Sequence, residues 1–535
     1  MSDTCARLLL CAAALCTSAS AEHVWLSPTG GGFATGANWS AGSMPGPSDR
    51  AVFSLPATYD VWAASPMSSF SMRVSAGDVS LKLSGGGSLD LLNPASSMWQ
   101  HSLNVGGPGL GATLRVAGGS LRARSAYLAS DAAHAALGEV SGAGSLWSCA
   151  DDLHVGFAGS ATLRAIDGGV CSARSIIVGG SFSASAGTLV HGHASQLIAS
   201  SRIVVGSSGQ AVLSIEQGAA CLSAYADLGA YAGSKGAVVV TGSGSTLDAQ
   251  HQVSVGGSAF TSKAGVGSLT VEAGASVNTT RLAIAENPEG SGAVLVQGPD
   301  TFITAQSVVI GPVDTPHTSP SATMRVASGA MLLASNVSIS PYARLDGDGL
   351  ISASVVSNGI IQPGADVPGT LRIDGDYTQI PGPNYALATS ELRVRIGASA
   401  DAAVAGSLDV TGAASLGGRL RVSFVPGFVP EVGQVFRVLS ASSVDGAFQQ
   451  VILPTPTTAW RLRFLPDALG ASIEVISGGI PGDTNGDCIV NFSDLNNILS
   501  TYGQTGLGLV GDANGDGVVN FHDLNLALSN YGQTC

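Results

Sequence analysis

The chain is built on an internal repeat, and this repeat limits the folds that are open to it. A short apolar segment that ends in glycine recurs at steps of 50 residues, and a fifth copy follows 55 residues after the fourth. The five glycines are Gly106, Gly156, Gly206, Gly256 and Gly311. A second series, which includes Ile177-Val178-Gly179 and Asp227-Leu228-Gly229, lies midway between these copies. The structural unit is therefore about 25 residues long.

Each unit has the composition of short strands joined by tight turns. The chain holds 72 glycines but only 11% charged residues, and alternating runs such as Ser268-Leu269-Thr270-Val271 follow the turns. Strands this short cannot bury their apolar side alone, whereas stacked units bury it and pair their backbones. We therefore predict a right-handed parallel β-helix over 56–345. About eleven rungs at the ~4.8 Å strand spacing would give a rod ~50 Å long.

The residues that flank the repeats support this fold by resemblance. Trp25, Asn38-Trp39-Ser40 and Pro45-Gly46-Pro47 precede them, and Leu345-Asp346-Gly347 follows them. Together with the repeats, these segments resemble the β-strand repeats of bacterial autotransporter passengers and exported PEP-CTERM proteins. The resemblance implies a β-helix whose N-terminal cap is 22–55. We expect Trp25 and Trp39 to pack inside that cap.

The 50-residue period is lost after 346, but strand patterns continue. Alternating runs occur, for example, at 392–396 and 420–424. The open end of a solenoid exposes unpaired strand edges, which invite aggregation. We therefore interpret 346–476 as a separate β-rich module that closes the end, followed by a short linker at 477–481.

The N-terminus has the pattern of a secretory signal peptide. Arg7 precedes a short apolar run, and Ala19-Ser20-Ala21 forms a small-residue cleavage site. A membrane span needs about 20 apolar residues, and this run is about half that length. We predict a signal peptide at 1–21, no membrane span, and a secreted chain that is extracellular or bound to the cell surface.

Two acidic loops near the C-terminus have the spacing of calcium ligands. In each loop, oxygen-bearing side chains occupy positions 1, 3, 5, 9 and 12, and a backbone carbonyl is available at position 7. This pattern lets a 12-residue loop surround one hard cation with oxygen atoms. The predicted ligands of two Ca²⁺ ions are Asp483, Asn485, Asp487, Ile489, Asn491 and Asp494, then Asp512, Asn514, Asp516, Val518, Asn520 and Asp523.

A short helix is predicted after each loop, because apolar residues follow at helical spacing. They are Leu495, Ile498, Leu499 and Tyr502, then Leu524, Ala527, Leu528 and Tyr531, with Gly503 and Gly532 ending the helices. A tandem loop-helix pair with Asp at position 12 resembles a type I dockerin, here 482–535. The resemblance implies calcium-dependent binding to a cohesin-like protein. It places the partner-binding surface at Phe492, Ser493, Phe521 and His522.

Five cysteines follow the predicted signal peptide. Dockerin termini lie close together, so the resemblance suggests a disulfide between Cys488 and Cys535; the alternative is two free thiols. Cys149 and Cys171 lie about one repeat apart and could pair. Cys171 and Cys221 are two rungs apart, or ~9.6 Å, which is beyond the reach of a disulfide.

Charge excludes one class of partner. The net charge of −14 leaves no basic patch to neutralise phosphates, so we predict no nucleic-acid binding. Parallel β-helices also include polysaccharide hydrolases and lyases, and Asp151-Asp152, His191-Gly192-His193 and Arg202 invite that comparison. Consecutive residues on a strand point to opposite faces, however, so the two aspartates could not act on one bond.

We therefore predict a secreted, non-catalytic β-solenoid that serves as a stalk or adhesive surface. Its dockerin would attach it to a cohesin-like partner in a setting of polysaccharide degradation. Two alternatives remain open: a β-helix polysaccharide hydrolase or lyase, and a carbohydrate-binding rod, each delivered by the dockerin.

Overall fold

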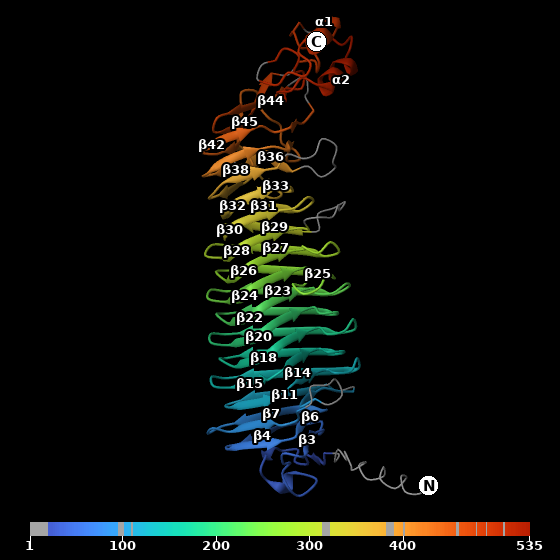
Figure 1. Ribbon diagram of the computed structural model, residues 1–535, viewed down its shortest axis with the longest axis vertical. Helices are drawn as coiled ribbons and strands as arrows, with labels where there is room; N and C mark the ends of the chain where they lie inside the picture. Colours follow the sequence, from blue (N-terminus) through green and yellow to red (C-terminus); the bar gives the residue numbers. More distant parts are fainter. Residues whose placement is uncertain are drawn as a thin grey trace, which may run out of the picture.

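The computed structural model describes residues 20–94, 101–108, 111–312, 322–380, 390–399, 402–455, 460–477, 479–487, 489–506 and 509–534. The predicted signal peptide lies almost entirely outside these residues. The described chain forms a parallel β-solenoid of about 15 turns, drawn as a long stack of strands in Figure 1. The N-terminal segment lies at one end of the stack, and the C-terminal helices lie at the other.

Two long sheets run along the stack, one of 26 and one of 19 strands within the described residues. The first sheet contains β1 (Glu22–Val24), β3 (Arg50–Phe53), β5 (Pro66–Ser69), β6 (Ser71–Val74), β8 (Ser88–Leu91), β9 (Leu103–Val105), β12 (Ser120–Ala123), β13 (Ala126–Leu128), β15 (Leu146–Cys149), β16 (Asp152–Val155), β18 (Val170–Val178), β20 (Gln196–Val205), β22 (Ala220–Leu228), β24 (Thr246–Val255), β26 (Ser276–Ile284), β28 (Phe302–Ile310), β30 (Met331–Ile339), β32 (Leu350–Ser357), β34 (Thr370–Ile373), β35 (Tyr377–Gln379), β38 (Ser407–Val410), β39 (Ala413–Leu416), β41 (Val435–Ser440), β42 (Ser443–Gly446), β44 (Trp460–Asp467) and β45 (Gly470–Ser477).

The second sheet contains β2 (Gly31–Gly32), β4 (Thr58–Ala63), β7 (Gly77–Leu83), β10 (Gly107–Pro108), β11 (Ala112–Ala117), β14 (His134–Ser141), β17 (Ser160–Ile166), β19 (Ser185–His191), β21 (Gln210–Glu216), β23 (Lys235–Thr241), β25 (Val266–Glu272), β27 (Ser291–Gln297), β29 (Ala322–Ala327), β31 (Arg344–Gly347), β33 (Ile360–Pro363), β36 (Glu391–Ser399), β37 (Ala402–Ala405), β40 (Arg419–Phe424) and β43 (Gln450–Ile452). Through the repeats, each coil passes once through each sheet, and neighbouring coils pair in parallel.

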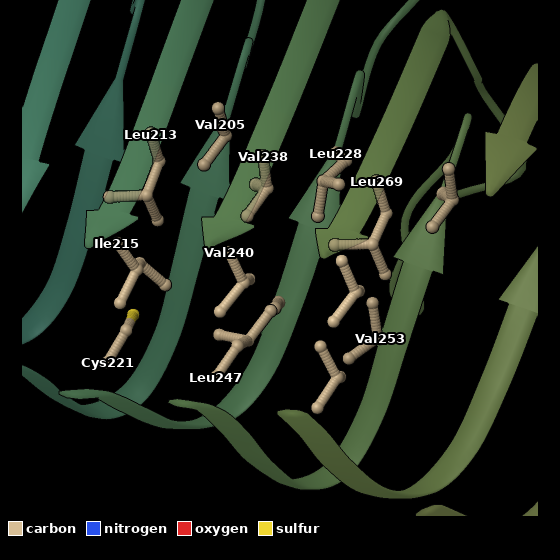
Figure 2. Packing of buried hydrophobic residues seen from close by; sticks show 14 of the residues in the cluster. Val205, Leu213, Ile215, Cys221, Leu228, Val238, Val240, Leu247, Val253 and Leu269 are labelled. Carbon is tan, nitrogen blue, oxygen red and sulfur yellow. The ribbon is translucent and has the colours of Figure 1, made fainter. Parts of the chain in front are cut away.

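The core lies between the two sheets and is built from columns of equivalent residues. In the second sheet, Leu213 pairs in register with Val238, and Val238 pairs with Leu269. Cys221 and Leu247 occupy one column of the first sheet, facing these residues across the interior (Figure 2). All of these side chains are buried. A slip of one residue would turn such a column outward, so the repeat length is fixed by the core.

The glycine that ends each repeated segment sits at a corner of a coil. Gly206 and Gly229 have φ values of +71° and +69°, a region that side chains rarely allow. A Cβ atom at either position would lie 2.3 Å from a carbonyl oxygen of the next coil. Both the backbone conformation and the close approach therefore require glycine there.

The opposite corner explains why the period spans two coils. Two types of turn alternate there from coil to coil. A buried side-chain hydroxyl in one turn forms a hydrogen bond with the backbone of the turn in the preceding coil. The Ser195 hydroxyl donates to the His191 carbonyl at 2.7 Å and accepts the Gly168 amide at 3.0 Å. Ser245 makes the same pair of bonds one period later. Each coil is thus complementary to its neighbour rather than identical to it.

The region 346–476 is β-rich but is not the separate module that we expected, because its strands continue the two sheets. In the second sheet, parallel pairing continues through β33, β36, β40 and β43. The solenoid therefore has more coils than the eleven or so expected from the repeats alone. Aligned positions on these strands are Ile360, Glu391, Arg419 and Gln450. Their spacing is irregular, which is why no period is visible in the sequence. An antiparallel hairpin, β44–β45, then closes the first sheet against β41.

The N-terminal end is closed by aromatic side chains. Trp25 and Trp39 are fully buried and pack edge to face, with ring centroids 5.0 Å apart. Phe33 and Phe53 pack against Trp39. The prediction that both tryptophans lie inside the N-terminal cap is confirmed.

The described part of the C-terminal segment contains two α-helices, α1 (Phe492–Ser500) and α2 (Phe521–Ser529). They end a few residues before Gly503 and Gly532, the expected ends. No helix in the described ranges is both long and apolar enough to cross a membrane.

The solenoid cysteines Cys149, Cys171 and Cys221 are buried free thiols. Cys171 pairs in register with Trp147 and with Leu197, so a bridge from Cys149 to Cys171 is wrong. Cys221 lies one coil beyond Leu197, two coils from Cys171, as the spacing predicted. Cys488 and Cys535 lie outside the described residues.

Candidate calcium-binding loops

Residues at the end of each C-terminal loop cap the N-terminus of the helix that follows. The Asn491 side chain accepts the Ser493 amide at 2.7 Å, and Asp494 accepts the Asn491 amide at 2.9 Å. Asn520 and Asp523 form the same reciprocal pair at the start of α2. Such a capping box satisfies amides that a helix leaves unpaired at its N-terminus. The residues at loop positions 9 and 12 therefore have a structural role in addition to any role as ligands.

The position-12 carboxylates also reach back across their loops. The second oxygen of Asp494 accepts the amides of Thr484 at 2.8 Å and Asn485 at 3.2 Å. Asp523 accepts the Asn514 amide at 3.1 Å. Both aspartates are fully buried in spite of their charge. Each loop is thus folded around the carboxylate of its last residue.

The remaining predicted ligands converge on the same points. In the first loop, carboxylate oxygens of Asp483, Asp487 and Asp494 all lie within 4.8 Å of one another. The Asn485 side chain donates to Asp487 at 2.9 Å, and the Asn491 side-chain NH₂ donates to the Ile489 carbonyl at 3.4 Å. Side-chain oxygens and the position-7 carbonyl are therefore gathered around one small volume.

The second loop repeats several of these hydrogen bonds. Asp512 accepts the amides of Gly515 and Gly517 at 2.8 Å each. The Asn514 side chain donates to Asp516 at 3.1 Å, and Asn520 donates to the Val518 carbonyl at 3.4 Å. The two loops thus share these contacts, but among the described residues only the first loop has three carboxylates within 4.8 Å of one another.

Burial and mutual repulsion act on these carboxyls. Burial raises the pKa of Asp512 to about 6 and that of Asp516 to about 7, and it also raises the pKa of Asp523. Burial acts in the same direction on Asp494, but the amides of Asn491, Thr484 and Asn485 together lower its pKa. Buried like charges are stabilised by a cation placed between them. This donor set of hard oxygens fits Ca²⁺, which prefers carboxylate, amide and carbonyl ligands.

The two loop-helix units pack together through a small core. It consists of Ile480, Val490, Ile498, Ala513, Val519 and Ala527. Isolated bridges join Ile489 to Thr534 and Thr505 to Val518, so each loop is linked to the segment that follows the other helix. The arrangement gives the two units equivalent surroundings within this segment.

The apolar helix faces predicted from the spacing are only partly buried. Ile498 and Ala527 are in the core, and Leu495 and Leu524 pack against it. Four members remain exposed, namely Leu499, Tyr502, Leu528 and Tyr531. The spacing predicted an apolar face on each helix, but only part of that face is buried, and Tyr502 and Tyr531 lie beyond the last helical residues. Their repetition in both units is the signal that could have set them apart.

The residues expected to bind a partner are accessible. Phe492 is 70% exposed and Phe521 is 63% exposed, and each lies at the first position of its helix. Ser493 and His522, next to them, are exposed as well. Large exposed aromatic side chains in matching positions are unusual unless another molecule covers them.

Of the residues that invited comparison with polysaccharide hydrolases, the two aspartates share a partner: Arg174 lies 3.7 Å from Asp151 as well as beside Asp152, so they do not point to opposite faces as expected. Asp151 pairs with Arg124 at 2.8 Å, and Asp152 pairs with Arg174 at 3.0 Å. His191 is on the second sheet, 3.4 Å from Glu216. Arg202 is on the first sheet, with its guanidinium 5.7 Å from the centre of the Phe260 ring. His193 lies in the turn after β19.

The chain matches no known family model, and it is similar to no curated protein.

Proposed function

We propose that the C-terminal segment, 482–535, is a calcium-dependent docking module of the dockerin type. The solenoid would then be a secreted stalk or adhesive surface, attached through this module to a cohesin-like partner. The resemblance of the loops to dockerins implies polysaccharide degradation as the setting. The observation that carries the proposal is the set of oxygen donors in the first loop, where carboxylate oxygens of Asp483, Asp487 and Asp494 lie within 4.8 Å of one another, together with the equivalent hydrogen bonds of the second loop.

The exposed phenylalanines support the docking part of the proposal. They flank the loops at equivalent points, so a partner that reads one unit meets a similar surface on the other. The exposed Leu499 and Leu528 extend each surface along its helix. Aromatic and aliphatic anchors of this kind are typical of the centre of a protein interface.

Isothermal titration of the full chain with calcium tests the proposal. We expect two bound ions per chain, because each loop supplies a complete donor set. Asp483→Asn and Asp512→Asn should each weaken or abolish one of the two sites. A third substitution, Asp151→Asn, removes a solenoid carboxylate and should leave both sites intact. Heat signals that reveal no saturable site would refute the proposal.

A further inference from the structure

The two calcium-type loops have matching sequences but different surroundings. Gly486 and Gly515 occupy the same loop position, with φ values of +74° and +76°. A Cβ atom at Gly486 would meet no described atom within 4 Å, whereas one at Gly515 would lie 2.3 Å from the Leu462 carbonyl oxygen. At this position the second loop is therefore pressed against the solenoid, whereas the first loop is open there. Elsewhere the first loop also reaches the hairpin, because its Thr484 lines a cleft with Arg461 and Ile476.

The contact is made with the last strand of the first sheet. Among the described strands, β44 pairs only with β45, so its other edge is available. The Gly515 carbonyl accepts the Phe464 amide of that edge at 2.9 Å. Phe464 also lies 3.8 Å from the position a Cβ at Gly517 would take. An unpaired strand edge is a site of aggregation, and here the loop backbone covers part of it.

Two clefts show how the loop is seated between strands. One, of about 290 Å³, lies between Arg461 and Ile476 on the hairpin and Asp512 on the loop. The other, of about 150 Å³, lies between Ile452 at the end of β43 and Asp516 on the loop. The ligand-bearing part of the loop thus borders the closing hairpin on one side and the end of β43 on the other.

We propose that the second loop is a calcium-dependent clasp that fixes the docking module to the end of the solenoid. This inference rests on the proposed calcium binding. A bound ion holds Asp512, Asp516 and Asp523 together and thereby presents the Gly515 carbonyl to β44. Without the ion, these buried like charges repel, the loop loses its shape, and the Phe464 amide is released. The described part of the first loop makes no backbone hydrogen bond with β44, so its ion is not expected to hold the Phe464 amide.

Hydrogen exchange of the full chain tests the clasp. Calcium should slow exchange of the β44 peptide that contains Phe464 by about tenfold or more, since the amide gains a lasting partner. Asp483→Asn should keep this protection, and Asp512→Asn should lose it. If both variants and the parent protein bind calcium as expected but the peptide exchanges at one rate with and without the ion, the clasp is refuted and the calcium proposal stands.

A glycine pair gives the control that does not depend on removing a ligand. Gly515→Ala and Gly486→Ala introduce the same methyl group at nearly the same φ, so the strain within each loop is equal. Only Gly515→Ala meets the Leu462 carbonyl, and only this variant should expose the Phe464 amide in calcium. Equal exchange of the β44 peptide in the two variants would overturn the inference. A calcium titration that detects no binding would instead refute the proposed function itself.

Discussion

Single buried hydroxyl groups set the long period of the solenoid. Ser195 and Ser245 each satisfy a carbonyl of their own coil and an amide of the preceding one, and Thr301 accepts the corresponding Gly274 amide at 2.9 Å. All three residues are fully buried. The sequence shows a period of two coils, but it does not show that alternating turns cause it, because the bond joins residues 27 positions apart.

Replacing one of these hydroxyls should destabilise the fold. Ser245→Ala leaves the Gly218 amide and the Thr241 carbonyl without their partner, and we expect a loss of about 1–3 kcal/mol in the free energy of unfolding. Ser245→Thr should cost much less, because Thr301 already occupies the equivalent place. Urea denaturation followed by fluorescence measures both. A loss for threonine as large as that for alanine would contradict the assignment.

One inward-pointing hydroxyl group, that of Thr188, destabilises the fold instead. Thr188 lies in the core column between Leu163 and Leu213, and its buried hydroxyl has no hydrogen-bond partner among the described residues. Thr188→Val keeps the shape and removes the unsatisfied group, so unfolding should become harder by about 1 kcal/mol. Thr162→Val, on an exposed position of the neighbouring strand, is the matched control and should change stability little. The midpoint of urea unfolding compares the two variants.

At the scale of elements, regular spacing decided what the sequence could predict. The strands between 56 and 345 follow from the repeat, and parallel pairing follows from stacking. The coils at 346–476 could not be recognised as solenoid, because residues such as Glu391 and Arg419 align across turns of unequal length. The exposure of Leu499 and Tyr502 was likewise hidden, since helical spacing alone does not say how much of a face its partner covers.

The two short helices should act as interchangeable docking elements. Phe492→Ala or Phe521→Ala alone should leave capture by a cohesin-type partner nearly normal, because the other unit still presents a similar surface. The double variant should lose capture. Binding of the calcium-loaded full chain to a panel of immobilised cohesin domains measures this. Full capture by a double variant that still binds two calcium ions would show that the partner uses another face.

At the scale of the molecule, the rod is closed differently at its two ends. The N-terminal end is closed by a core of aromatic side chains around Trp25 and Trp39, which needs no ligand. The C-terminal end is covered by the β44–β45 hairpin and by a loop that gathers buried carboxylates. The acidic loop stands out in the sequence by the spacing of its oxygen-bearing residues. Its contact with the solenoid does not, since Gly515 and Gly486 each stand in the same Asn-Gly-Asp sequence.

This difference between the loops predicts how calcium binding responds to pH. Burial in the second loop raises the pKa of Asp512 to about 6 and that of Asp516 to about 7, above the ~3.9 of an unfolded aspartate. Such groups hold protons in the folded, calcium-free chain that the unfolded chain has already released. The contribution of these two groups to the stability of the calcium-free form therefore falls as pH rises from about 4 to about 7. Bound calcium would reverse this trend, because a cation stabilises ionised carboxylates and displaces their protons.

We therefore expect the second site to weaken first when the pH is lowered. Its calcium affinity should reach its highest value above pH ~7.5. Below the two pKa values, each carboxyl that must release a proton should lower the affinity by about tenfold per pH unit. In the first loop, amide donors lower the pKa of the central Asp494, so that carboxylate stays ionised through this range. Calorimetric titration of the full chain should thus find two strong calcium sites at about pH 8 and only one at about pH 5.5. Asp512→Asn keeps only the first site and serves as the control, because its remaining site should bind almost equally at both pH values. Equal weakening of the two sites would mean that burial against the solenoid does not govern the carboxylates of the second loop.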